Sequence, residues 1–238
     1  MMQMLQQIYS APAFSIAISV AAYAIGVLIY KKTKQPFCNP LLLAVIIVCA
    51  VVVICHISYK DYMQGGQFIT LLLTPATVIL AVPLFDQVKL IKKYAPVILI
   101  SITVGSVASL LSVFALCRVF GLDQQLTASL MPKSITTAIA LGVSDTLGGI
   151  QAVTAVATLL SGIIGAVLGP IIFKALRVKN RVAVGLAMGT ASHAVGTSKA
   201  LELGEDEGAM SSLAIGVAGI ITVVIAPILF TLLWNVWG

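Results

Sequence analysis

Long apolar runs constrain this chain more than any other feature of its sequence. Five runs, at 11–30, 41–57, 95–117, 150–173 and 208–236, contain no Asp, Glu, Lys or Arg. About 20 apolar residues in a helix are enough to cross a bilayer. Only 9% of the residues are charged, whereas a soluble domain has roughly 25%. The sequence therefore predicts an all-α integral membrane protein that is embedded in a lipid bilayer.

A sixth apolar run, 68–86, completes a prediction of about six full spans. It contains Pro75 and Pro83, so we expect it to be bent or broken. The polar stretch YKDYMQGGQ before it is predicted to be a loop between two spans. The run at 11–30 is not preceded by a basic segment, which a cleaved signal peptide would require.

Basic residues gather in three clusters between the spans, and this pattern predicts the topology. Short loops rich in Lys and Arg remain on the cytoplasmic side of the membrane. The N-terminus is therefore predicted to lie outside, and the net charge of +6 indicates topology and not nucleic-acid binding. The clusters consist of Lys31, Lys32 and Lys34; Lys89, Lys92 and Lys93; and Lys174, Arg177, Lys179 and Arg181.

The third basic cluster leads to a topological conflict. To bring it inside, the chain must cross the membrane an odd number of times between residues 118 and 174. Two segments lie there, at 127–147 and 150–173. The simplest solution makes 127–147 a re-entrant or broken-helix hairpin that is entered from outside. A second hairpin of the opposite orientation is then predicted at 185–203.

The two hairpin segments resemble each other, which predicts an inverted repeat. SITTAIALGVSD at 134–145 aligns with GTSKALELGEDE at 196–207, and each is followed by a span containing GII and then P-I-x-F. A unit of one hairpin and one crossing inverts when it is repeated, as in many secondary transporters. We therefore expect an N-terminal four-span part at 1–120 and two hairpin-plus-span units at 121–238.

The polar residues of the hairpins suggest an anion site. A half-helix N-terminus presents free N–H groups and a partial positive charge. Such termini are predicted near 134–137 and at Thr197 or Ser198, so two of them would face a small organic acid anion between Lys133 and Lys199. The predicted substrate-binding residues are Lys133, Ser134, Thr136, Thr137, His193, Gly196, Thr197, Ser198 and Lys199.

Several of these residues have a purely structural alternative. His193 and Lys199 could equally form hydrogen bonds to loop carbonyls. Asp145, Glu202 and His193 are candidates to carry a coupled proton; for the two acids the reason is that burial raises the pKa of a carboxyl group. The alternatives for the acids are solvation at the interface or a Lys199–Glu202 ion pair one helical turn apart. The acids at 205–207 are predicted to form a solvated hairpin end.

Other chemistries have no signature in this sequence. The four cysteines lack metal-ligand spacing, so no metal site is expected. The sequence contains no HExxH, P-loop or GxSxG motif. We therefore expect neither an enzyme nor a bound cofactor.

Three motifs resemble those of a known family. MPKSITTAIALGVSDTLGG, GLAMGTASHAVGTSKALE and EGAMSSLAIGVAGIITVVIAP are similar to segments of the LrgB/CidB family of bacterial antiholin-like membrane proteins. The resemblance covers nearly the whole chain and implies a location in the bacterial cell membrane. It also extends to the plastidal glycolate/glycerate translocator, while bacterial relatives are linked to pyruvate movement.

The resemblance implies two functions. The first is transport of small monocarboxylates, which we expect here because it also accounts for the polar hairpins. The alternative is antiholin-like modulation of murein hydrolase export and autolysis, together with a small LrgA/CidA-type membrane protein. A purely regulatory scaffold is a third interpretation. A homodimer is expected, because small helical transporters often need a partner surface to hold a scaffold still.

Overall fold

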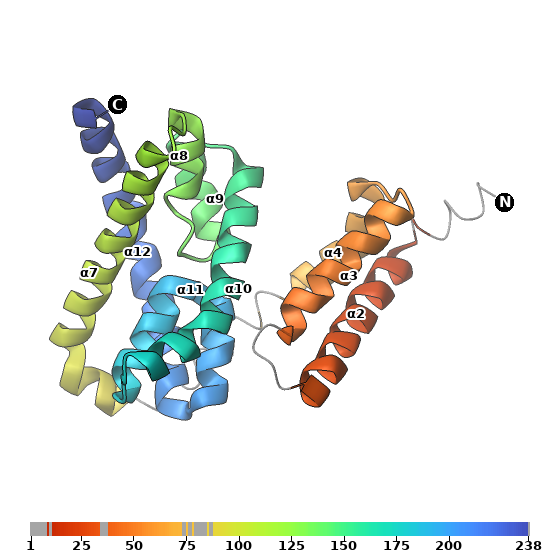
Figure 1. Cartoon of the computed structure of the whole chain (residues 1–238), viewed down its shortest axis with the longest axis horizontal. Coiled ribbons are helices and arrows are strands. Elements are labelled where there is room, and N and C mark those ends of the chain that lie inside the picture. The colour runs from red at the N-terminus through yellow and green to blue at the C-terminus, as the bar shows by residue number, and fades with distance from the viewer. Residues whose placement is uncertain are drawn as a thin grey trace. The chain divides into compact units, whose positions relative to one another are not determined.

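The computed structural model describes residues 11–33, 38–72 and 88–237, together with Tyr9, Pro75, Val78 and Phe85. Every regular element in these residues is a helix (Figure 1), which confirms the predicted all-α class. The chain packs as two compact units, Met1–Ile79 and Leu80–Gly238. This is a division by packing, and the predicted functional boundary at residue 120 stays a prediction.

The N-terminal unit contains α2 (Pro12–Thr33), α3 (Pro40–Ile54) and α4 (Tyr59–Leu71). Asn39 caps α3 by accepting a hydrogen bond from the Leu41 N–H at 2.9 Å. The prediction of a loop at YKDYMQGGQ is wrong, because this stretch forms most of α4. Ser58 starts the helix by accepting from the Asp61 N–H at 3.1 Å, as N-cap serines do.

Packing against α2 explains why this polar stretch is helical. The Tyr62 hydroxyl lies 2.7 Å from the Ser19 hydroxyl, so α4 presents hydrogen-bonding groups to its neighbour. The predicted span at 68–86 begins within α4, and most of it lies outside the described residues.

In the second unit, the described residues form six helices: α7 (Val88–Val119), α8 (Gln124–Leu130), α9 (Thr137–Thr146), α10 (Gln151–Ala175), α11 (Arg181–Leu203) and α12 (Glu205–Trp237). Within the described residues, four helices are long and apolar enough to cross a membrane, namely α2, α10, α12 and the Ala95–Val119 part of α7. The fifteen-residue α3 is apolar but shorter. These helices coincide with five of the six predicted spans.

The carboxyl-terminal ends of α7 and α12 lie at the same face of the second unit. The Arg118 guanidinium stands over the Trp234 ring at 5.1 Å, and Phe114 meets that ring edge-on at 6.3 Å. Much of the core lies around these two helices and α9, with Leu110, Phe114, Ala140, Met210 and Phe230 among its buried members.

The first predicted hairpin is confirmed by the lengths and contacts of α8 and α9. These helices have 7 and 10 residues, which at 1.5 Å per residue is about 10 and 15 Å, too short for a core of about 30 Å. Ser129 on α8 accepts from the Ile150 N–H at 2.7 Å, and its carbonyl accepts from Thr154 at 2.8 Å. The hairpin therefore returns to the end where α10 begins.

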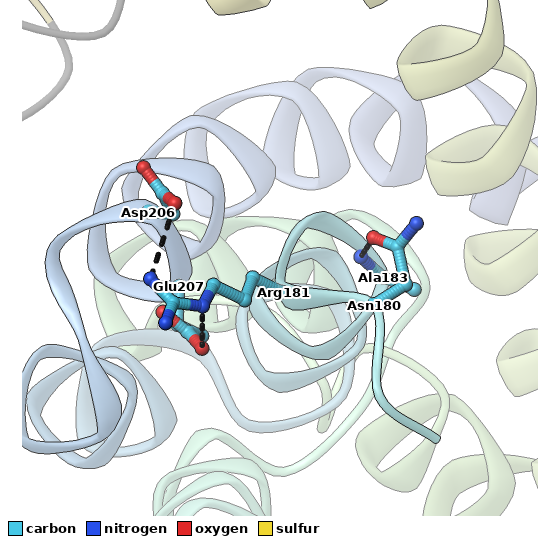
Figure 2. Close-up of polar contacts among 5 residues, drawn as sticks. All are labelled: Asn180, Arg181, Ala183, Asp206 and Glu207. Carbon is cyan, nitrogen blue, oxygen red and sulfur yellow. Dashed lines mark hydrogen bonds and ion pairs between the residues drawn. The ribbon is translucent and has the colours of Figure 1, made fainter.

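The second predicted hairpin is the folded helix α11. A straight helix of its 23 residues would hold its ends about 35 Å apart. His193 instead has φ 42° and ψ −137°, which reverses the direction of the chain. Arg181 consequently reaches Asp206 at 3.6 Å and Glu207 at 3.9 Å (Figure 2), so the base of the hairpin is closed by ion pairs.

The two hairpins approach α10 from opposite ends, as the inverted repeat predicts. The pair α8 and α9 belongs to the amino-terminal end of α10, and α11 belongs to its carboxyl-terminal end (Figure 1). Figure 2 shows the residues that begin the second hairpin beside those that begin α12. Each hairpin thus starts and finishes on its own side of the unit.

Labelling from each side of the membrane tests this topology. Single cysteines at the exposed positions Lys179 and Glu205 should both react from the cytoplasmic side with an impermeant maleimide. Cysteines at Gln125 and Thr146 should both react from outside. The unsubstituted chain controls for the four natural cysteines. Reaction of positions 179 and 205 from opposite sides would mean that α11 crosses the membrane.

Candidate functional site

The breaks of the two hairpins meet at the middle of α10. Lys133, in the first break, places its Nζ 3.4 Å from the Ser161 hydroxyl. The Ser161 hydroxyl lies 3.5 Å from the Ala191 carbonyl, close to the second break. His193 Nε2 lies 2.9 Å from the Thr158 carbonyl. Ser161 is about 15 Å along α10 from its first residue, which corresponds to half the thickness of a bilayer core.

Small residues on α10 allow this close approach. A Cβ on Gly162 would lie 2.6 Å from His193 Cε1, and a Cβ on Gly165 would collide with the Ser192 hydroxyl. The face of α10 that carries both glycines therefore packs inside the unit, against α11. Small residues are used in this way wherever helices in membranes need close backbone contact.

The first break exposes a helix N-terminus beside a cation. The half-helix α9 begins at Thr137, within the predicted region, and its N-cap Thr136 makes no side-chain capping hydrogen bond. The N–H groups of the first turn are thus not capped by the side chain that usually accepts from them. Lys133 is half-buried and takes part in none of the ion pairs found in the described residues. Ser134 is buried and pairs with Ser109 on α7 at 2.7 Å.

The second half-helix starts earlier than predicted, at Ala194, because the reversal occurs at His193 itself. Thr197 is consequently one turn inside the helix. Its hydroxyl donates to the His193 carbonyl at 3.0 Å and lies 2.7 Å from the Ser211 hydroxyl on α12. Gly196 packs on the Met188 carbonyl of the other half. Both residues therefore hold the hairpin together.

The remaining predicted residues lie further from the breaks or face outward. Ser198 is exposed and donates to the Ala194 carbonyl at 3.2 Å. Lys199 and Glu202 form an ion pair at 2.6 Å, which is the structural alternative that the sequence left open. Asp145 is exposed and accepts from the Gln151 amide at 3.1 Å. Neither acid lies at the meeting point of the breaks.

A cavity of about 600 Å³ lies between α7 and α11. Asn180 and Asp206 line it at the base of the second hairpin, and Gly105 and Thr190 line it near the breaks. The cavity therefore extends from the side of the third basic cluster toward the middle of the unit. No residue of α7 was among the predicted substrate-binding residues, yet α7 forms one wall of this cavity.

Comparison with known proteins identifies the family of this chain. The LrgB-like family matches residues 19–232. The chain belongs to the LrgB-like family. Antiholin-like protein LrgB of Bacillus cereus (strain B4264) is 41% identical over 217 residues, which are 91% of this chain and 94% of the relative. The proteins of the same name from Bacillus cereus (strain AH187) and Bacillus anthracis (strain A0248) match with the same values. No solved structure matches this chain.

One acid of this LrgB-like protein was placed wrongly by the sequence. The acids at 205–207 were expected to be solvated together, but Glu207 is 8% exposed and its Oε2 atom has no hydrogen-bond partner. Its other oxygen faces Arg181. The relevant signal was the position of Glu207 in the first turn of α12, where the helix dipole favours an acid.

Substitution of Gly162 tests how closely α10 and the second break must approach. We expect Gly162→Ala to destabilise the protein by roughly 1–3 kcal/mol, as overpacking does, because the new methyl group meets the His193 ring. Gly216→Ala is the matched control, since a Cβ there meets nothing within 4 Å. Thermal unfolding in detergent measures both. Equal midpoints for the two variants would show that His193 is not held against α10.

Proposed function

We propose that this LrgB-like protein transports small monocarboxylates of the pyruvate, glycolate and glycerate class. The observation that carries the proposal is the position of Lys133. It lies beside the middle of α10 without an ion-pair partner among the described residues. An ionisable group at membrane depth is costly and usually functional, and a carboxylate is the partner that Lys133 lacks.

The first turn of α9 supplies the rest of an anion site. Its N–H groups and the positive end of its dipole favour negative charge. Lys133, Ser134, Thr136 and Thr137 come from this break, and His193 comes from the opposite one. In this proposal Gly196, Thr197, Ser198 and Lys199 shape the second hairpin around the substrate. Asp145, Glu202 and His193 stay candidates for a coupled proton.

The architecture also supports alternating access to such a site. Two hairpins of opposite orientation that meet near the midplane are typical of secondary transporters. The cavity of about 600 Å³ is within the usual range for small-molecule sites and leads from the base of the second hairpin. It would serve as the approach from the side of the basic loop, which the positive-inside rule makes cytoplasmic.

A second function, antiholin-like modulation of murein hydrolase export and autolysis, has its own support. The relatives carry the name antiholin-like protein, and this name supports modulation more directly than it supports transport. In that case a small LrgA/CidA-type membrane protein would be the partner. A homodimer remains a proposal under either function.

Counterflow in proteoliposomes of this chain alone tests transport. Labelled pyruvate and glycolate should exchange while a trapped larger dye is retained. Lys133→Met keeps the length of the side chain but removes its charge, and we expect at least a tenfold lower exchange rate, equivalent to about 1.4 kcal/mol. Lys174→Met, at an exposed position in the last turn of α10, is the matched control and should exchange normally.

The same variant separates the two functions in cells. A bacterium that lacks its own copy is given either the unsubstituted chain or Lys133→Met at equal expression, and lysis is measured. If transport is the primary activity, the Lys133→Met protein should fail to restore normal lysis. A variant without carboxylate exchange that still restores lysis would favour direct modulation, and dye release in the liposomes would indicate a pore.

A further inference from the structure

A small cavity with a mixed lining lies where four elements of the second unit meet; its apolar lining residues are Leu110, Met131, Pro132 and Ile135. It has a volume of about 10 Å³, enough for one water-sized species. Five hydroxyl-bearing residues line it: Ser106 and Ser109 from α7, Ser134 from the first break, Thr190 from α11 and Thr222 from α12. It is adjacent to the large cavity, because Thr190 lines both.

Ser106 is the residue that indicates a bound species. Its side chain is 4% exposed, and its hydroxyl has no hydrogen-bond partner. Leaving a buried hydroxyl unsatisfied costs about 1–3 kcal/mol, and a serine inside a helix can avoid this cost by donating to the carbonyl four residues earlier. Ser112 on the same helix does so, with its hydroxyl 2.6 Å from the Ala108 carbonyl.

Two carboxyl-terminal helix ends lie beside the cavity. Pro132 comes shortly after the end of α8, and Thr190 lies in the last turn of the first half of α11. The carboxyl-terminal ends of helices carry partial negative charge. The cavity thus lies beside the carboxyl-terminal ends of α8 and of the first half of α11, and Ser134 and Ile135 connect it to the start of α9.

The ligand chemistry narrows the class of cation. Hard cations take oxygen ligands, and Na⁺ in transporters is coordinated near unwound backbone and half-helix carboxyl-terminal ends. No acid lines the cavity, so it offers little to a divalent ion. Among the described residues no group of three His, Cys, Asp or Glu could hold a metal ion.

We infer that this cavity is a Na⁺ site, formed by the hydroxyls of Ser106, Ser109, Ser134, Thr190 and Thr222 between the first break and α7, α11 and α12. Na⁺ binding stands on this geometry alone. Its coupling to a carboxylate rests on the proposed function. Ser134 links the two sites because it follows Lys133 directly in the chain. An ion bound to Ser134 would therefore hold in place the break that carries Lys133, the proposed partner of the carboxylate.

Cation-specific stabilisation of the purified full chain tests the site. Thermal unfolding is measured in NaCl, KCl and choline chloride at equal ionic strength. Na⁺ should raise the unfolding midpoint saturably above the other two salts, because a ligand that binds the folded state stabilises it. Ser106→Ala and Thr222→Val should each remove this difference. Ser112→Ala should keep it.

The outcomes distinguish this proposal from transport. Equal midpoints in the three salts for the unsubstituted chain would overturn the Na⁺ site and leave the cavity to a water molecule. If Na⁺ still raises the unfolding midpoint of both Ser106→Ala and Thr222→Val above the other two salts, the ion binds elsewhere. That result would also overturn the proposed site. Loss of the Na⁺ stabilisation in both variants supports the site. An absence of carboxylate exchange in liposomes would overturn only the transport proposal and would leave the Na⁺ site standing.

Discussion

The second unit depends on the way α10 covers two interruptions of helical structure at membrane depth. Non-helical backbone is tolerated there only where protein or a wet cavity satisfies it. Thr158 provides a carbonyl for His193, Ser161 lies between Lys133 and the Ala191 carbonyl, and Gly162 leaves room for the imidazole ring. One helix thus supports both breaks, which explains why they lie together.

The two breaks are related by orientation but differ in construction. The first is an open turn at 131–136 that exposes a helix N-terminus and a half-buried lysine. The second is a reversal at one residue, closed by ion pairs at its base. The proposed carboxylate and Na⁺ positions both use the first break. The carboxylate position lies at the amino-terminal end of α9, and the Na⁺ position lies beside the carboxyl-terminal ends of α8 and of the first half of α11. Opposite charges could therefore occupy neighbouring positions within one small region.

The sequence predicted the hairpins for a sound physical reason. Four basic residues after the span at 150–173 are costly to translocate, so an odd number of crossings had to precede them. Local polarity was less informative. The stretch at 59–67 resembles a loop, yet it is helical because it packs on α2. Glu207 resembles a solvated acid, yet its burial depends on Arg181, which is 26 residues away in the chain.

The sequence by itself determined the membrane class, five of the described helices, both hairpins and the family, because these follow from hydropathy, charge and motifs that are local in the chain. Only the tertiary structure decided which polar residues share a place. It brought Lys133 and His193 to α10, paired Lys199 with Glu202, and assembled hydroxyls from four elements around Ser106. Such groupings depend on contacts between distant segments, which no local pattern encodes.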